Sequence, residues 1–229
     1  MLIVIEGIDG SGKSVVVGAS RAFFERHGLR VLDLRGKTRY PEEKLLLHYD
    51  AVLCGEPTHT TLGRDVRALV QAEGDVLRMA RAFSADRKQL FERVVIPMRG
   101  KLVVEERSFL SSVVYQAVPR EKLLALPGNA LAVRYPPALV LLADCPVRLA
   151  LERLALREKK DRAVFEKAGP LQKARDRYLG EDFSGLVGRL GAKLIKIDTS
   201  GSIAETDEQC VRALSSVFKD TRRTAPGGF

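Results

Sequence analysis

One eight-residue segment constrains this chain more than any other: Gly7-Ile8-Asp9-Gly10-Ser11-Gly12-Lys13-Ser14. It matches the pattern G-x-x-x-x-G-K-[ST] at every fixed position. A short apolar run, 2–5, precedes it and a helical pattern, 15–27, follows it, so the segment lies between a strand and a helix. Glycines in such a turn let successive backbone N–H groups surround a phosphate, and the helix directs its positive end at the same anion. The sequence therefore predicts a phosphate-binding loop.

Two side chains of this loop have a predicted chemical role. Lys13 is expected to reach the β- and γ-phosphates of a nucleotide, and the Ser14 hydroxyl is expected to bind Mg²⁺. GTP switches, helicases, transport ATPases and small-molecule kinases all share such a loop. The loop alone therefore predicts nucleotide binding without naming a reaction.

The rest of the chain alternates short apolar runs with longer amphipathic stretches, which is typical of a parallel sheet with helices on both faces. The candidate strands are 2–5, 31–34, 51–54, 101–104, 138–143 and 193–197. The candidate helices are 15–27, 62–72, 75–99, 146–157, 169–189 and 202–218. Two segments fit this rhythm poorly, the polar stretch 35–50 and the charge-dense stretch 153–167.

Composition narrows the class of protein. A chain of 229 residues with 45% hydrophobic and 29% charged residues has enough apolar surface for one folded domain. The net charge of +9 favours anionic partners such as nucleotides, phosphates or nucleic acid. Cys54, Cys145 and Cys210 lack metal-site spacing and suit isolated thiols in a reducing compartment. Because neither a secretion leader nor a 20-residue apolar span is visible, we expect a cytoplasmic protein without a membrane partner.

Further motifs follow the loop in a fixed order. They are Gly55-Glu56-Pro57-Thr58, Phe83-Ser84-Ala85-Asp86-Arg87, Glu106-Arg107-Ser108 with Ser111, Ser112, Tyr115 and Gln116 behind it, Asp161-Arg162, and Ile197-Asp198. In order and spacing, over nearly the whole chain, this set resembles the thymidylate kinase family, which phosphorylates dTMP to dTDP with ATP. The resemblance implies an α/β P-loop kinase fold: a five-stranded parallel sheet with helices on both faces and a short mobile lid. It also implies one domain, 1–220, with the lid at about 153–167, a tail at 221–229, ATP with Mg²⁺ as donor, and a homodimer.

The same resemblance implies the acceptor site. Its predicted residues are Asp9, Glu56, Phe83, Arg87, Arg107, Ser112, Tyr115 and Gln116. Phe83 would stack on the thymine, and Arg87, Ser112 and Gln116 would contact its polar edge. Tyr115 would pack beside the sugar and disfavour a 2′-hydroxyl, and Asp9 would lie near the acceptor's phosphate and 3′-hydroxyl.

The catalytic and metal residues follow in the same way. Glu106, in the place of the family's aspartate, is assigned with Ser14 to the Mg²⁺ site, and Arg107 is assigned to phosphate oxygens. Some family members carry an arginine within the phosphate loop, where this chain has Gly10. We therefore expect the lid to supply the cation that stabilises the transferring phosphoryl group, through Arg157 and Arg162.

Three departures from the family pattern bear on the acceptor. Gly55 stands where many members have an arginine, Ser108 stands where tyrosine or histidine is usual, and 35–50 adds length before Glu56. Arg67, shortly after Glu56, could compensate for the missing arginine or be ordinary surface. Two alternatives therefore stay open: a kinase for another nucleotide or a deoxynucleoside, and a nucleic-acid-stimulated ATPase, suggested by the acidic end of 102–106 and the positive charge.

Overall fold

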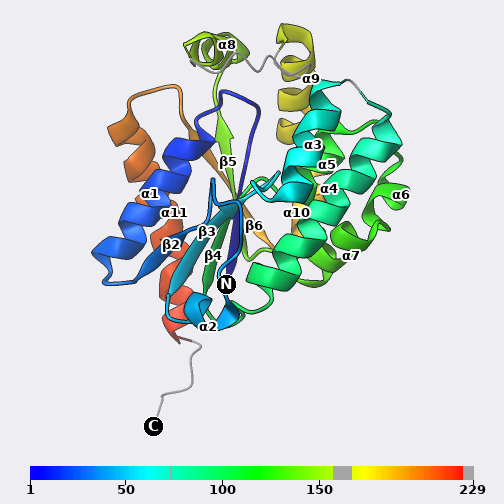
Figure 1. The fold of residues 1–229 in the computed structure, drawn as a ribbon. Coiled ribbons are helices and arrows are strands. Elements are labelled where there is room, and N and C mark those ends of the chain that lie inside the picture. Colours follow the sequence, from blue (N-terminus) through cyan, green and yellow to red (C-terminus); the bar gives the residue numbers. More distant parts are fainter. Residues whose placement is uncertain (73, 157–166, 224–229) are drawn as a thin grey trace.

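The computed structural model describes residues 1–72, 74–156 and 167–223, without side-chain detail beyond 218. Its strands are β1 (Leu2–Glu6), β2 (Val31–Asp33), β3 (Ala51–Gly55), β4 (Leu102–Glu106), β5 (Leu139–Asp144) and β6 (Lys193–Asp198). They form one parallel sheet in the order β2-β3-β4-β1-β5-β6 (Figure 1). The predicted α/β class with a parallel sheet is confirmed.

Helices connect consecutive strands. They are α1 (Lys13–Arg26), α2 (Glu43–Leu46), α3 (Thr61–Gln71), α4 (Val76–Leu90), the π-helical turn η1 (Phe91–Val95), α5 (Phe109–Tyr115), α6 (Arg120–Leu124), α7 (Pro127–Arg134), α8 (Val147–Ala155), α9 (Ala168–Leu179), α10 (Glu181–Arg189) and α11 (Ile203–Arg223). No helix among the residues described is both long and apolar enough to cross a bilayer.

The helices form a layer on each face of the sheet (Figure 1). Side chains alternate along β1, so Ile3 and Ile5 pack in the core beneath α1 and α11, whereas Val4 packs in the core on the opposite face. That second core joins the sheet to α4, α5, α9 and α10. Strands buried on both faces explain why the sequence shows them as continuous apolar runs.

The prediction of five strands is wrong, because the sheet has six. All six apolar runs named as candidate strands do form strands, so the error lies in the count of five that the resemblance implies. The edge strand β2 pairs with β3 through Val31 opposite Ala51 and Asp33 opposite Leu53. Between β2 and β3 the polar stretch 35–50 leaves the sheet and returns. Asp50 closes this excursion, because its carboxylate accepts from the backbone N–H of Arg30 at 2.9 Å. The stretch before Glu56 thus connects two neighbouring parallel strands.

Helix boundaries depart from the prediction at Gly180. The stretch 169–189 is two helices, α9 and α10, because Gly180 adopts extended backbone with φ −75° and ψ 158°. The predicted helix 75–99 is present over 76–95: Asp75 caps α4 by accepting from the N–H of Arg78 at 2.8 Å, and η1 continues it to Val95. Most of the predicted lid, 157–166, lies outside the described residues.

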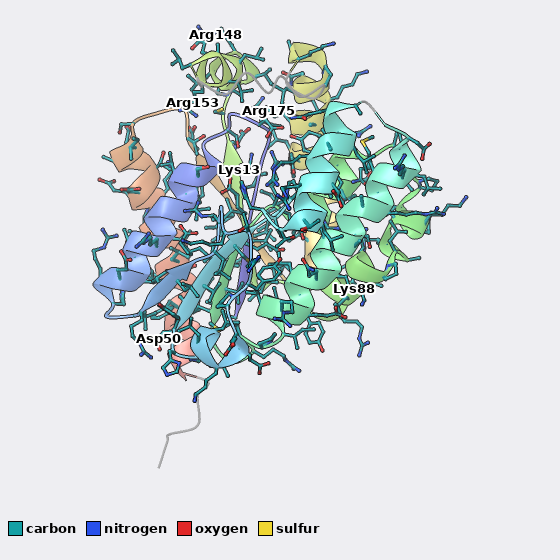
Figure 2. The ribbon with its side chains drawn as sticks, in the orientation of Figure 1. Lys13, Asp50, Lys88, Arg148, Arg153 and Arg175 are labelled. Carbon is teal, nitrogen blue, oxygen red and sulfur yellow. The ribbon has the colours of Figure 1, made fainter. Side chains whose placement is uncertain are left out.

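Because the strands are parallel, the segments that follow them meet at one edge of the sheet. The phosphate loop follows β1, Glu56 follows β3, and Arg107 follows β4. Figure 2 shows Lys13, Arg153 and Arg175 at this end of the molecule and Asp50 at the other. The predicted functional residues from distant parts of the sequence are therefore gathered at the carboxyl ends of the strands.

Candidate active site

The loop between β1 and α1 has the backbone shape that phosphate binding requires. Gly10 and Gly12 have φ of 76° and 85°, a left-handed conformation that glycine adopts without strain. The N–H of Ser11 closes the turn by donating to the carbonyl of Ile8 at 3.2 Å. A Cβ atom at position 10 would lie 2.3 Å from the carbonyl oxygen of Ala150 in α8. Glycine is therefore required there by packing as well as by backbone conformation, and the loop opens on the amino terminus of α1, which attracts anions.

Lys13 is the first residue of α1, and its side chain is buried against the loop. Only 6% of the residue is exposed. Its Nζ donates to the carbonyl of Gly7 at 3.1 Å and to that of Ile8 at 2.7 Å. Burial, reinforced by the nearby charge of Arg107, lowers the pKa of Lys13 to about 8, and neighbouring carboxylates oppose the shift. A bound phosphate would raise the pKa of Lys13 again, because an anion favours the charged amine.

Ser14 and Glu106 meet at the margin of the loop. The Ser14 Oγ donates to Oε1 of Glu106 at 3.3 Å, and Oε2 of Glu106 lies 3.4 Å from Nη1 of Arg35. Mg²⁺ at nucleotide sites takes one or two protein oxygens, because phosphates and waters complete its shell. The structure thus brings the two predicted metal ligands together, and a hydroxyl beside a carboxylate suits this ion.

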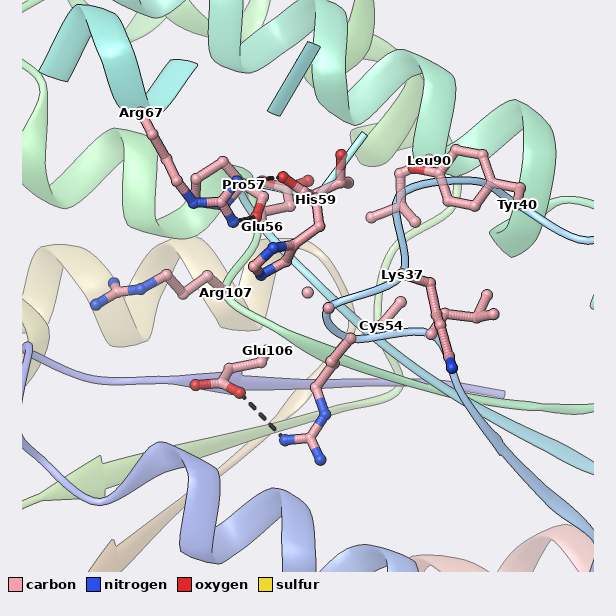
Figure 3. Close-up of a pocket in the computed structure, with 15 residues that line it drawn as sticks. Lys37, Tyr40, Cys54, Glu56, Pro57, His59, Arg67, Leu90, Glu106 and Arg107 are labelled. Carbon is pink, nitrogen blue, oxygen red and sulfur yellow. Dashed lines mark hydrogen bonds and ion pairs between the residues drawn. The ribbon is translucent and has the colours of Figure 1, made fainter. Parts of the chain in front are cut away.

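Two cavities open at this edge of the sheet. One, of about 290 Å³, lies beside the phosphate loop and is lined by Lys13, Ser14 and Arg153 among others. The second, of about 190 Å³, lies over the ends of β3 and β4 and is lined by residues that include Glu56 and Arg107 (Figure 3). Glu106 lines both cavities. A donor nucleotide in the first and an acceptor in the second would therefore meet at Glu106.

Arg107 occupies a strained position directly after β4. Its φ of 68° is the only positive value among non-glycine residues of the described chain, and such strain concentrates at functional sites. Its Nη2 pairs with Asp9, and its Nη1 donates to Ser111 Oγ at 3.2 Å. The guanidinium also lies 5.6 Å from the centre of the Tyr115 ring. Asp9, Arg107 and Tyr115, predicted separately, therefore form one cluster beside the phosphate loop.

Arg87 lies on α4, and its guanidinium is buried, with 1% of the residue exposed. Its Nε donates to Oε1 of Glu56 at 2.9 Å, and its Nη2 pairs with the other carboxylate oxygen. Nη2 also donates to Ser112 Oγ at 3.3 Å, and Nη1 donates to Oδ1 of Asn129 in α7. The structure thus joins three predicted residues through Arg87. It adds Asn129, whose signal in the sequence is only a polar amide within a mostly apolar helix.

The network continues from Ser112 to Gln116. Nε2 of Gln116 donates to Ser112 Oγ at 3.3 Å. Oε1 of Gln116 is buried and has no hydrogen-bond partner in the part of the chain that the structure describes. Phe83 is half-buried one helical turn before Arg87 and lines neither cavity. The group predicted to contact the base therefore keeps one acceptor atom unused.

A second carboxylate, Glu105, is completely buried behind this network. Burial, together with the charge of Glu56, raises the pKa of Glu105 well above the ordinary carboxyl value. Burial also raises the pKa of Glu56 to about 7, opposed by the charge of Arg87. Because the guanidinium contacts Glu56 directly, Glu56 keeps the negative charge and Glu105 holds the proton.

Ser108, one of the three departures, has a structural task. Its Oγ caps α5 by accepting from the N–H of Leu110 at 3.1 Å, and it donates to Glu6 at 2.8 Å. The side chain is buried and lines neither cavity. Ser108 therefore does not contact the acceptor cavity, and this departure from the family pattern does not alter the lining of that cavity.

The two predicted lid arginines, Arg157 and Arg162, lie outside the described residues. Arg153, at the end of α8, belongs to the same basic run and lines the cavity beside the phosphate loop. Its Nη2 donates to the carbonyl of Thr199 at 2.6 Å, and its buried Nη1 has no partner among the residues described. The sequence did not single out Arg153, since a charge run is usually a solvated helix face.

Comparisons with known proteins agree with this arrangement. Residues 37–209 match a family model described as thymidylate kinase. The chain is 35% identical to a probable thymidylate kinase of Thermococcus onnurineus over 78% of this chain and 82% of that protein. It is 33% identical to a probable thymidylate kinase of Thermococcus kodakarensis with the same coverage, and 28% identical to a thymidylate kinase of Kosmotoga olearia over 93% of this chain and 94% of that protein. With its motifs assembled at one edge of the sheet and the match extending over most of its length, the chain belongs to the thymidylate kinase family.

Proposed function

We propose that this protein transfers the γ-phosphoryl group of ATP to dTMP and forms dTDP. The observation that carries the proposal is the position of Glu106, whose carboxylate lines both the cavity at the phosphate loop and the cavity over β3 and β4. Two phosphorylated substrates entering from these cavities would bring their phosphates together at one point. Membership of the thymidylate kinase family supports the direction and the substrates of the reaction.

The donor side rests on the loop and its first helix. Backbone N–H groups of the loop and the positive end of α1 would surround the β- and γ-phosphates. The Lys13 amine would contact the same phosphates. Ser14 and Glu106 would hold Mg²⁺, which would neutralise part of the phosphate charge when bound. Catalysis of phosphoryl transfer is mostly positioning and electrostatic stabilisation, so these residues account for much of it.

The acceptor side rests on the network over β3 and β4. Arg107, held by Asp9 and Ser111, would contact the acceptor's phosphate. The unused Oε1 of Gln116 suits a ring N–H, which the 3-position of thymine provides. Phe83 would stack on the base, with Arg87 fixing the end of β3 through Glu56.

The remaining features of the proposal come from the family. We propose a single domain, 1–220, with a lid at about 153–167 whose Arg157 and Arg162 stabilise the transferring group. We also propose a cytoplasmic homodimer that uses Mg²⁺. In support, Arg153, at the start of this segment, lines the donor cavity.

A panel of acceptors at equal concentration tests the function. With ATP and Mg²⁺ we expect dTMP to have the highest kcat/KM, followed by dUMP, because a buried methyl group contributes about 1 to 3 kcal/mol of preference. UMP, CMP, AMP and thymidine should react far more slowly. A highest value for AMP, UMP or a nucleoside would refute the assignment. ATP hydrolysis that rises with DNA, without any phosphorylated monophosphate, would favour the ATPase instead.

A further inference from the structure

The acceptor cavity lacks the arginine that many family members place before Glu56. Gly55 holds that position, and the structure shows it packed against β4. A Cβ atom at Gly55 would lie 3.0 Å from the backbone oxygen of Glu106 and 3.2 Å from its Cβ. A side chain at position 55 would therefore require β3 and β4 to shift, so a cation for the acceptor's phosphate must come from elsewhere.

Arg67 does not supply it. Its Nη1 donates to the carbonyls of Thr58 and of Gly63, the latter at 3.1 Å, and its Nη2 donates to the carbonyl of Pro57. The guanidinium thus braces the turn between β3 and α3 from within. Arg67 also lines the cavity, but its three hydrogen bonds hold it to backbone oxygens of this turn, so we assign Arg67 a structural role.

The turn after the edge strand β2 brings a different arginine to the cavity. Arg35 lies two residues after β2, and Asp33 fixes its side chain: Nε donates to Oδ1 at 3.0 Å and Nη2 donates to Oδ2 at 2.8 Å. Nη1 reaches Oε2 of Glu106 at 3.4 Å, the ion pair drawn dashed at Glu106 in Figure 3. These bonds use three of the five guanidinium N–H groups, so two remain for an anion.

A second cation follows in the same turn. Gly36 has φ of 77°, and the N–H of Lys37 donates to the carbonyl of Leu34 at 3.1 Å, which turns the chain beside the cavity. Lys37 lines that cavity, is exposed, and forms no ion pair with the residues that the structure describes. Its charge is therefore not neutralised by a neighbouring carboxylate.

Charge in the cavity favours a phosphate. Arg35, Lys37, Arg67 and Arg107 line it together. Of the carboxylates that line it, Glu56 is paired with the buried Arg87, and Glu106 lies at the boundary with the donor cavity. A planar guanidinium held by a carboxylate is suited to bind phosphate oxygens in a fixed direction, and a lysine adds an adaptable point charge.

We propose that Arg35 and Lys37 bind the phosphate of the acceptor nucleotide and replace the arginine that is missing at Gly55. The proposal rests on the proposed function, because it concerns the acceptor of that reaction. It gives the segment after β2 a role: the edge strand positions a phosphate-binding residue, and Asp33 orients it.

The test compares two ligands that differ only in the phosphate. Dissociation constants for dTMP and for thymidine are measured with the full-length wild type and with Arg35→Ala and Lys37→Ala. Loss of a charge-assisted contact should weaken dTMP binding by about tenfold or more and leave thymidine binding unchanged. Arg39→Ala is the matched control, since it removes the same charge from an exposed residue of the same segment that does not line the cavity.

The two variants also separate a direct role from an indirect one. Arg35 contacts Glu106, so an effect through the metal site would appear as a higher KM for ATP-Mg²⁺, whereas Lys37 makes no ion pair with any residue of 1–72, 74–156 or 167–218. A ratio of dTMP to thymidine affinity that stays at the wild-type value in both variants overturns the proposal. So does an equal loss for both ligands in Lys37→Ala. A wild type that phosphorylates other monophosphates but not dTMP refutes the proposed function instead.

Discussion

The buried position of Lys13 leads to a prediction about stability as well as activity. The replacement Lys13→Met keeps an unbranched chain of similar length and removes the amine. Turnover should fall at least about a hundredfold, because the amine stabilises charge on the phosphates. The effect of this replacement on the free energy of unfolding should depend on pH, because the pKa of Lys13 is lowered in the folded protein.

The magnitude follows from that pKa. It falls from 10.5 to about 8, and one pKa unit corresponds to about 1.4 kcal/mol. Below pH 8 the amine is charged in both the folded and the unfolded chain, and its burial costs about 3 kcal/mol. Between pH 8 and 10.5 the folded protein releases the proton while the unfolded chain keeps it, so the free energy of unfolding rises with pH. Lys13→Met has no such contribution.

Urea unfolding at several pH values measures this difference. The chain has no tryptophan, so far-ultraviolet circular dichroism is the suitable signal. The unfolding free energy of the wild type minus that of Lys13→Met should rise by about 3 kcal/mol from pH 7 to pH 10. Lys88→Met is the control: Lys88 is exposed on α4 in a surface ion pair with Glu92, so its curve should run parallel to the wild type. If the unfolding free energy of Lys13→Met changes with pH in the same way as that of the wild type, the reasoning is refuted.

Two further predictions concern the buried carboxylate and the lid. The folded protein keeps the Glu105 proton above the pH at which the unfolded chain loses it, so wild-type stability should fall above about pH 4.5 by about 1.4 kcal/mol per pH unit until the folded pKa is passed. Glu105→Gln should remove this dependence and unfold at higher urea than the wild type at pH 8; a lower midpoint there would contradict the assignment of the proton. Arg157→Ala and Arg162→Ala should lower kcat more than they raise the KM for dTMP, as expected for contacts made in the transition state. If both single variants and the double variant keep the wild-type kcat, the two arginines have no catalytic role and form only a charged surface.

The parts of the fold that the sequence predicts are those fixed by local chemistry. The phosphate loop is specified by glycines and a helix start within eight residues, and the strands are specified by apolar runs. The count of five strands was wrong although each of the six apolar runs forms a strand, because the count came from the family resemblance and not from the runs. Gly180 ends α9 within a stretch whose apolar period continues into α10, so the pattern alone predicts one helix.

The site shows the same division. Residues in the family's motifs contact one another in pairs, Ser14 with Glu106 and Arg107 with Ser111. Asn129 and Arg35 belong to no motif, and only the packing of α7 on α4 and of β2 on β3 brings them to the site. The burial of Lys13 was also not visible, since it depends on backbone carbonyls folding over its amine.

The contact between Gly10 and Ala150 bears on how this chain can evolve. A first mutation to arginine at position 10 would meet a backbone oxygen and an unfavourable φ together, so the resulting protein would fold poorly before the new side chain could serve catalysis. Only a lineage in which α8 had already moved away could accept the change. The family places this arginine either in the loop or in the lid, and from this sequence a single substitution therefore does not lead to the loop arrangement. Selection on activity alone would keep the descendants of this protein without a loop arginine.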